Sequence, residues 1–320
     1  MIFNSHLGLI GAGKWGLNYV KTIQNIDESI LKKIACKNPK NKSKLIHKYD
    51  VSNNWHDVTS SSDIQGVIIA TPPKNHFEIA KEAIQNKKSV IIEKPVTLNS
   101  KDAKYLKDLA LKNKVSVRVN HVYLYHPLYR ILKYYIAQQK KLNSINSIAG
   151  NYGPFRNDVS PLWDWAPHDI AMCLDIMGEF PSTISAHFSE REEKDKKNQF
   201  NVSINLCFKN NKFAFLNVGN IMHSKKRFLK VNFENKSLIF DPLNFNSIQE
   251  VKGSTLLPIN PSAEFSSFDC FTTPLEILLK EFIKDIKNSS AIISDLILGE
   301  KVVQVIEIVD KQLLSIHSQK

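Results

Sequence analysis

Short apolar runs alternate with amphipathic stretches over the first 120 residues. The runs show no apolar–polar alternation, so both faces of each strand are expected to be buried, as in a parallel sheet between helix layers. We predict strands at residues 6–10, 31–36, 66–70, 89–92 and 115–119, with helices at 17–25, 39–49, 77–86 and 100–112, the last capped by Ser100. This order predicts a doubly wound α/β domain over residues 1–120.

The pattern changes after residue 121. A helix is predicted at residues 123–138, and runs of alternating apolar and polar residues follow, which predict an antiparallel sheet with one open face. The strands are predicted at 183–189, 200–208, 213–217, 228–234 and 237–241, before closing helices at 274–287 and 298–317. Residues 121–320 therefore form a predicted α+β domain with a largely antiparallel, open-faced sheet.

A glycine-rich turn follows the first predicted strand. It reads Gly11-Ala12-Gly13-Lys14-Trp15-Gly16 and opens the first helix. In a dinucleotide-binding turn, Gly11 permits the tight turn, Gly13 lets the backbone approach a pyrophosphate, and Gly16 lets the helix pack closely. The free N–H groups of the helix start attract the anion. Residues 1–120 are therefore expected to be a Rossmann domain that binds NAD or NADP.

The end of the second strand bears on the choice between these two cofactors. NAD sites usually place an acid there to accept bonds from the ribose hydroxyls. Residues 34–42 contain no acid, but they contain Lys37, Lys40 and Lys42. A ribose phosphate would be attracted by these charges, so NADP is the preferred prediction, with Lys37 as its contact. The alternative is that the lysines only mark the exposed start of a helix.

Two further strand ends carry candidate site residues. The carboxyl ends of the strands in an open α/β sheet face the ligand crevice. After the strand at 66–70, the loop is expected to cover the cofactor with Thr71, Pro72, Asn75 and His76. Glu93-Lys94-Pro95 ends the next strand, where Glu93 and Lys94 lie beside the cofactor and Pro95 fixes the turn, with a cis bond as one option.

These motifs resemble the glucose–fructose oxidoreductase/inositol dehydrogenase/MocA (Gfo/Idh/MocA) family. The resemblance rests on residues 11–16, 71–76 and 93–95 and on the later stretch Leu162-Trp163-Asp164-Trp165-Ala166-Pro167-His168-Asp169, and it covers nearly the whole chain. It implies a nicotinamide-dependent oxidoreductase of sugars, nucleotide sugars or cyclitols. Lys94 resembles the family's catalytic-site lysine, and Asp164 and His168 resemble its acid and histidine. The chain departs from many members in lacking an Asp after the second strand.

The chemistry of these three side chains agrees with the resemblance. Hydride transfer at a secondary alcohol or ketone requires a proton transfer at the oxygen, which His168 can perform near neutral pH. His168 follows Pro167 at the predicted start of a helix at 170–177, which favours the neutral ring. Asp164 can orient that ring, and Lys94 can stabilise charge on the oxygen. The alternative is that Asp164 and His168 are helix caps. Asp169 is expected to be a helix-start residue.

Substrate contacts are expected from polar and aromatic side chains in the second domain. The candidates are His121, Tyr152, Arg156, Trp163 and Trp165, of which the two tryptophans could stack on a sugar ring. Each could equally serve domain packing. Residues 152–168 look similar to family members that act on nucleotide sugars in surface-polysaccharide synthesis.

Bulk composition adds the remaining expectations. The net charge is +12, but the excess lysines are scattered, so neither nucleic acid nor a membrane is expected as a partner. Cys36, Cys173, Cys207 and Cys270 lack zinc or disulfide spacing, and no signal peptide is seen, so we expect a cytoplasmic protein without a metal. The family resemblance implies a homodimer or homotetramer that pairs through the open sheet face. Two alternative functions are a reductase of a non-sugar substrate and a nicotinamide-binding regulatory protein without turnover.

Overall fold

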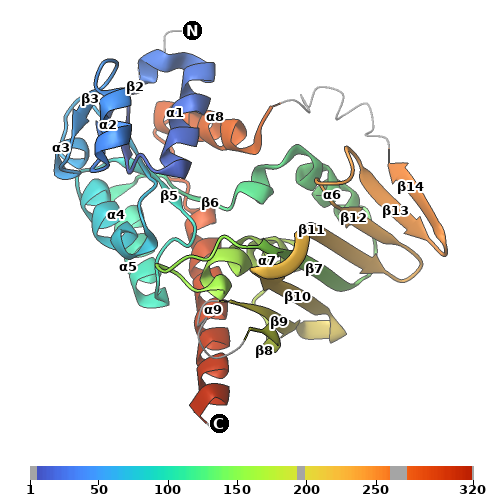
Figure 1. Ribbon diagram of the computed structural model, residues 1–320. Coiled ribbons are helices and arrows are strands. Elements are labelled where there is room, and N and C mark those ends of the chain that lie inside the picture. Colours follow the sequence, from blue (N-terminus) through green and yellow to red (C-terminus); the bar gives the residue numbers. More distant parts are fainter. Residues whose placement is uncertain (1–5, 193–198, 260–271, 319–320) are drawn as a thin grey trace. The chain divides into compact units, whose positions relative to one another are not determined.

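The chain divides into two compact units in the computed structural model, which describes residues 6–192, 199–259 and 272–318. Unit 1 comprises Met1–Val122 and Thr273–Val303, and unit 2 comprises Tyr123–Thr272 and Gln304–Lys320. Both are discontinuous in sequence, because helix α8 (Pro274–Lys287) and the first part of α9 (Ser294–Ser318) return to unit 1 (Figure 1). The single boundary predicted after residue 120 does not include this return.

The sheet of unit 1 has six parallel strands in the order β3-β2-β1-β4-β5-β6. This is the Rossmann order, with the topological switch between β1 and β4, and it confirms the predicted doubly wound domain. The strands are β1 (Leu7–Ile10), β2 (Leu31–Ala35), β3 (Asp50–Ser52), β4 (Gly66–Ile69), β5 (Ser89–Glu93) and β6 (Val117–Asn120). Every residue of β1, β4, β5 and β6 is buried, as expected for strands covered on both faces.

The connections of unit 1 are mostly helical. They are α1 (Lys14–Asp27), η1 (Glu28–Ile30), α2 (Pro39–Leu45), α3 (His56–Thr59), η2 (Pro73–Asn75), α4 (His76–Gln85) and α5 (Ser100–Asn113). The cap of α5 differs from the prediction. Asn99, and not Ser100, is the N-cap, because its side chain accepts a hydrogen bond from the Asp102 backbone N–H at 2.8 Å.

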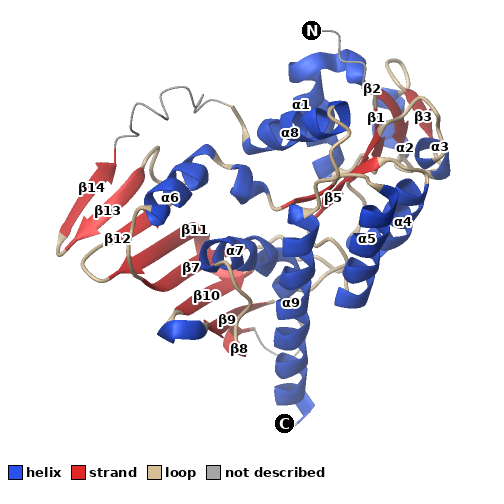
Figure 2. Ribbon diagram, turned by 180° about the vertical axis from the view of Figure 1, so that it is seen from behind, coloured by secondary structure: helices blue, strands red, loops and turns tan. Residues whose placement is uncertain are grey.

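Helix α8 is an integral part of unit 1. A Cβ added to Gly66 of β4 would lie 2.6 Å from Ile286 and 2.8 Å from Phe282, so glycine lets α8 approach the sheet. On β6, Arg118 donates to both carboxylate oxygens of Asp285 at 2.6 and 3.1 Å, in a nearly buried ion pair. Figures 1 and 2 both show α8 beside α1, which it contacts.

In the described residues of unit 2, eight strands form a mostly antiparallel sheet in the order β14-β13-β12-β11-β7-β10-β9-β8, and among these strands only the β7–β10 pair is parallel. The strands are β7 (Leu142–Tyr152), β8 (Thr183–Arg191), β9 (Phe200–Cys207), β10 (Phe213–Gly219), β11 (Ile221–Phe233), β12 (Ser237–Phe240), β13 (Ile248–Lys252) and β14 (Thr255–Ile259). Strands β7, β13 and β14 were not predicted from the sequence. The central strand β7 escaped because Asn and Ser occupy much of it.

One face of this sheet is open and the other is covered. Phe213 and Phe215 of β10 are 38% and 44% exposed, whereas Ala214 and Leu216 between and after them are buried. The buried face packs against α7 (Pro161–Met177) (Figure 2). Unit 2 also contains η3 (Val122–Tyr125), α6 (Pro127–Ala137) and η4 (Lys209–Asn211). The alternating pattern of the sequence therefore predicted a largely antiparallel sheet with an open face, although it did not reveal β7, β13 and β14.

Two features bear on the bulk expectations. Within the described ranges, no helix has both the length and the apolar character that a membrane span requires. Cys36, Cys173 and Cys207 are free thiols, and Cys270 lies outside the described residues.

Candidate functional site

The glycine turn of unit 1 contains two positions at which the backbone conformation and packing of the protein require glycine. Gly11 has a φ of +94°, and a Cβ there would lie 2.6 Å from the Ala70 carbonyl oxygen. A Cβ on Gly16 would lie 1.9 Å from the Gly11 carbonyl oxygen. The expected close packing of Gly16 is therefore made mainly against the turn itself, so these two positions hold the loop in shape.

Gly13 differs from its neighbours, because a Cβ there would meet no atom of the described residues within 4 Å. Gly13 is the N-cap of α1, makes no side-chain cap and lines a pocket. Packing within the protein would allow a larger residue at this position, so the open space beside Gly13 is available to a ligand. The start of α1 then presents backbone N–H groups to that space, which fits a pyrophosphate.

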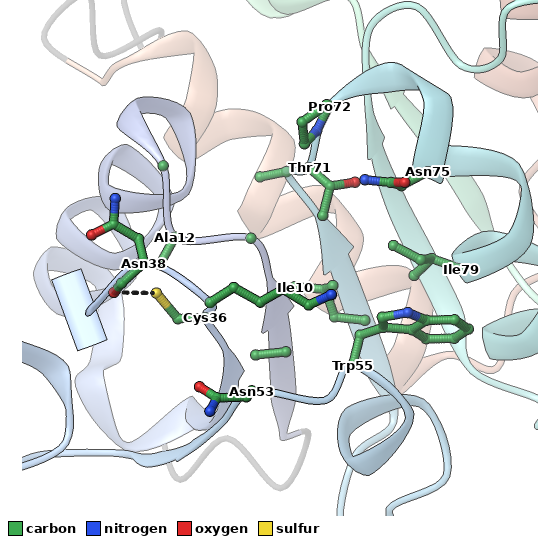
Figure 3. Close-up of a pocket in the computed structure, with 15 residues that line it drawn as sticks. Ile10, Ala12, Cys36, Asn38, Asn53, Trp55, Thr71, Pro72, Asn75 and Ile79 are labelled. Carbon is green, nitrogen blue, oxygen red and sulfur yellow. Dashed lines mark hydrogen bonds between the residues drawn. The ribbon is translucent and has the colours of Figure 1, made fainter. Parts of the chain in front are cut away.

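The pocket beside this turn has a volume of about 300 Å³ (Figure 3). Seven predicted cofactor residues line it, namely Gly11, Ala12, Gly13, Lys37, Thr71, Pro72 and Asn75. The other lining residues are Ile10, Ala35, Cys36, Asn38, Asn53, Trp55, Ala70 and Ile79. In Figure 3, Thr71 and Asn75 face one another on one side, and Trp55 lies below Ile79. Among the described residues, no carboxylate lines the pocket, so no negatively charged side chain of the lining repels a phosphorylated ligand.

The end of the pocket near β2 carries positive charge. Lys37 lines the pocket and is exposed, and Lys42 donates a hydrogen bond from Nζ to Oδ1 of the lining residue Asn53 at 3.0 Å. The Asn41 side-chain amide donates to the Ala12 carbonyl at 2.7 Å, which ties the start of α2 to the glycine turn. The basic stretch is thus fixed beside this pocket.

Asn53 and Trp55 are pocket residues that sequence analysis missed. Both follow β3, a three-residue strand whose sequence Asp-Val-Ser contains one apolar residue. Had β3 been predicted, its carboxyl end would have identified both residues as site candidates. The Trp55 ring stacks on His56 with centroids 3.7 Å apart, and His56 pairs with Glu82 at 2.8 Å. The Trp55 ring is therefore held in place by His56 and forms an aromatic wall of the pocket.

The remaining predicted cofactor residues, Lys14, Trp15, Gly16, His76, Glu93 and Lys94, do not line this pocket. His76 is fully buried, with its ring nitrogens each 2.9 Å from a carbonyl oxygen, those of Thr71 and Pro95. Burial lowers the pKa of His76, although these carbonyls oppose the shift. His76 therefore joins the two loops that follow β4 and β5.

Glu93 is a buried carboxyl group at the end of β5. It accepts hydrogen bonds from the Tyr19 hydroxyl at 2.9 Å and from the Asn120 amide at 2.6 Å. Burial raises the pKa of Glu93, and these bonds and the charge of Lys94 oppose that rise. The adjoining Lys94–Pro95 bond is cis, the option considered from the sequence, and Lys94 is half-buried.

His121 is the predicted substrate contact that lies in unit 1. It is almost fully buried, and this burial, followed by the charge of Lys94, lowers the pKa of its ring to about 3. The ring is therefore neutral at physiological pH and cannot serve as a cation for the substrate.

Helix α7 of unit 2 corrects the sequence analysis. It begins at Pro161 and not at residue 170, so Pro167 lies inside the helix and His168 lies beyond its second turn. Pro161 occupies the first helical position, which proline favours. Leu162 and Ala166 are buried, so the first turns of the helix pack into the core of unit 2. The helix start therefore cannot account for a neutral His168. Asp169 is not a helix-start residue either, because it is fully buried and paired with Arg227 at 2.6 Å.

Asp164 and His168 lie one helical turn apart on α7. Arg156, predicted as a substrate contact, donates to Asp164 at 3.0 Å and holds Asp158 through two further bonds of 2.9 and 2.6 Å. Asp158 was not predicted from the sequence, because it belongs to none of the motifs. The local structure thus fixes Asp164 through an arginine.

The other predicted substrate residues of unit 2 differ in their surroundings. Trp163 is buried, and its indole N–H points to Asp310 of α9 at 3.4 Å, so its ring serves packing. The indole nitrogen of Trp165 is buried, with no hydrogen-bond partner among the described residues. Tyr152 is 55% exposed and meets Phe155 edge to face at 5.3 Å. Trp165 and Tyr152 therefore stay candidates for substrate binding.

Known proteins are similar to this chain in sequence and fold. Residues 5–121 match the model of the Gfo/Idh/MocA oxidoreductase family with an NAD-binding Rossmann fold. A putative oxidoreductase of Magnetospirillum magnetotacticum has 31% identical residues and a TM-score of 0.86, over 95% of this chain and 99% of that one.

Two of the curated relatives that match part of the chain have named substrates. One is the scyllo-inositol 2-dehydrogenase (NADP⁺) of Bacillus subtilis, 24% identical over 62% of this chain and 59% of the relative. The other is the UDP-N-acetylglucosamine 3-dehydrogenase of Acidithiobacillus ferrooxidans, 26% identical over 39% of this chain and 40% of the relative. The chain thus spans about half the length of the curated relatives it matches. Together with the Rossmann strand order and the glycine turn, these matches show that the chain belongs to the Gfo/Idh/MocA family of oxidoreductases.

Proposed function

We propose that this protein is an NADP(H)-preferring dehydrogenase or reductase of a secondary alcohol or ketone in a sugar, nucleotide sugar or cyclitol. The observation that carries the proposal is the acid-free pocket at the glycine turn, in which Gly13 leaves open space and Lys37 supplies positive charge. The curated relatives act on an inositol and on a nucleotide sugar, and one is named for NADP⁺.

The residues of unit 1 fit a phosphorylated dinucleotide. The turn from Gly11 to Gly13 and the start of α1 would hold the pyrophosphate, and Lys37 would attract a ribose phosphate. Trp55 offers a flat aromatic face for the adenine, and Thr71, Pro72 and Asn75 would form the opposite side of the pocket. When bound, the nicotinamide supplies or accepts the hydride.

The protein's own residues handle the proton and the charge on the substrate oxygen. In the oxidation direction, His168 takes the proton of the substrate hydroxyl, and in reduction it returns that proton. The Lys94 ammonium donates a hydrogen bond to the same oxygen and stabilises the charge that develops there. Asp164, held by Arg156, orients the His168 ring from one turn away. The convergence of Lys94 and His168 on one substrate oxygen is part of this proposal.

The test is turnover with a small panel of compounds. Wild-type protein is assayed with scyllo-inositol and UDP-N-acetylglucosamine, each with NADP⁺ and NAD⁺, beside His168→Ala and Lys94→Ala. We expect turnover of at least one compound, and losses of roughly 10²–10⁴-fold in kcat for each variant, because each removes a group that acts on the oxygen. Affinity for NADPH is expected to change little in His168→Ala.

Two outcomes contradict the proposal. If both variants turn over the active compound as fast as the wild type, the assignment of His168 and Lys94 is wrong. If the wild type binds NADPH but oxidises or reduces no compound in a widened panel of keto-sugars, a regulatory nicotinamide-binding function replaces it.

A further inference from the structure

In unit 2, the residue that follows His168 on α7, Asp169, forms a buried ion pair with Arg227. The Arg227 guanidinium donates from Nη1 to Oδ2 of Asp169 at 2.6 Å, and the Ser147 hydroxyl donates to the other oxygen of Asp169 at 2.6 Å. The Asp169 side chain is fully buried, and that of Arg227 is 5% exposed. Both carboxylate oxygens are therefore occupied, which is the condition for keeping such a charge inside a protein.

The pair extends to His168 through one aromatic ring. The guanidinium carbon of Arg227 lies 4.2 Å from the centroid of the Tyr123 ring, in a cation–π contact. The Tyr123 ring meets the His168 ring edge to face, with centroids 5.2 Å apart and planes at 87°. Tyr123 thus contacts both the buried cation and the proposed acid–base residue.

Three separate elements contribute to this cluster. Tyr123 belongs to η3, Arg227 to β11, and His168 and Asp169 are neighbours on α7. Asp169 binds Arg227 to α7, the helix that also carries His168. The Arg227 guanidinium, the Tyr123 ring and the His168 ring are therefore held in fixed positions relative to one another. A planar guanidinium can hold a ring face in place in a way that an ammonium cannot.

We propose that Tyr123 is a positioning residue for His168, and that the Arg227–Asp169 pair holds Tyr123 in place. This inference rests on the proposed function, in which His168 exchanges the substrate proton. An acid–base side chain works only when its reacting nitrogen is held within a fraction of an ångström of the proton it transfers. Tyr123 supplies that restraint on the ring without itself touching the proton.

The test compares two substitutions of Tyr123. Tyr123→Leu removes the aromatic ring, and Tyr123→Phe, the matched control, keeps the ring and loses only the hydroxyl, which hydrogen-bonds with Arg227. For the panel compound with the highest turnover, we expect kcat to fall roughly 10- to 100-fold in Tyr123→Leu and much less in Tyr123→Phe, because the ring face against Arg227 and the edge against His168 remain. The KM and the affinity for NADPH are expected to stay within about twofold in both, because the loss concerns orientation of the acid–base group.

A second readout needs no substrate. The ring-nitrogen chemical shifts of His168 in the free protein report whether one tautomer and one orientation dominate. We expect matching shifts in wild type and Tyr123→Phe, and shifted or averaged signals in Tyr123→Leu. Arg227→Lys keeps a cation for Asp169 but lacks the planar group, so it should show an intermediate loss of kcat, whereas removal of the charge would leave Asp169 buried and unpaired.

The two proposals fail in distinguishable ways. If His168→Ala is inactive while Tyr123→Leu keeps wild-type kcat and wild-type His168 shifts, the positioning role is overturned and the proposed function stands. If His168→Ala turns over the compound normally, the proposed function fails, and the nitrogen shifts alone then decide whether Tyr123 orients the ring. Equal losses in Tyr123→Leu and Tyr123→Phe would also overturn the role of the aromatic ring.

Discussion

At the scale of single residues, the structure shows which of the lysines after β2 lines the pocket, a difference that the sequence does not reveal. Lys37 and Lys40 follow the same strand, and both are exposed, but Lys37 lines the pocket at the glycine turn and Lys40 does not. A charge close to the ribose phosphate acts strongly, whereas a charge on the exposed start of α2 is screened by solvent. Cofactor choice should therefore depend on Lys37 in particular.

We predict that Lys37→Asp weakens NADPH binding much more than NADH binding. The substitution replaces an attraction for the ribose phosphate with a repulsion, and it provides an acceptor for ribose hydroxyls. The ratio of the two dissociation constants should shift by at least about tenfold, equivalent to about 1.4 kcal/mol. Titration of each cofactor against the protein's fluorescence measures both constants.

Lys40→Asp is the matched control, because it makes the same change in charge three residues away and outside the pocket lining. Its ratio of constants should stay close to the wild-type value. An equal shift in both variants would mean that the net charge of the α2 region, and no contact with Lys37, governs the preference.

The sequence predicted some of the residues that line this pocket and missed others for a physical reason. Gly11, Gly13 and Thr71 were identified because they belong to motifs tied to strand ends. Trp55 follows a strand too short to show a pattern. Asp169 was taken for a helix-start residue, since nothing in one sequence shows that Arg227 lies opposite it in space.

At the scale of elements, the glycines of the turn serve two different requirements, the stability of the fold and the space for a ligand. Gly16 serves the fold, because a Cβ there would lie 1.9 Å from the Gly11 carbonyl oxygen. Gly13 has open space and a φ of −75°, which any residue can adopt. Substitution by alanine should therefore damage stability at one position and ligand binding at the other.

We predict that Gly16→Ala lowers the free energy of unfolding by about 1–3 kcal/mol, because the backbone must move to relieve the clash. Gly13→Ala should change that free energy by less than about 0.5 kcal/mol. It should nevertheless weaken NADPH binding by about tenfold or more, because the methyl group enters the space expected for the pyrophosphate. Urea unfolding and NADPH titration of both variants measure these effects, and unchanged NADPH affinity in Gly13→Ala would argue against a pyrophosphate at this turn.

Elements were predictable where their periodicity was strong. The buried strands of unit 1 and the helix α8 match their predicted positions within a few residues. The start of α7 was misplaced because both Pro161 and Pro167 can begin a helix, and only packing of Leu162 and Ala166 selects the first. Strand β7 was missed because pairing with β10 and β11 on either side, and not its own polar sequence, makes it a central strand.

At the scale of the whole molecule, the sequence order of the elements conceals which of them share a core. The change in pattern after residue 120 marks the end of the parallel sheet, but α8 returns to that sheet from more than 150 residues later. Long-range contacts of this kind leave no local signal. Phe282 and Ile286 show ordinary helical periodicity, which does not say which sheet they cover.

We predict that residues 6–122 alone do not form a stable cofactor-binding domain, whereas the same segment joined to residues 273–303 by a Gly–Ser linker does. Without α8, Arg118 would lose both oxygens of Asp285, and the Gly66 region would lose the cover of Phe282 and Ile286. A nearly buried guanidinium without its carboxylate and an uncovered apolar sheet both disfavour folding. Circular dichroism melts should show a cooperative transition only in the joined protein, and only that protein should bind NADPH. A cooperative, NADPH-binding 6–122 fragment would mean that α8 adds to the Rossmann core without being needed to form it.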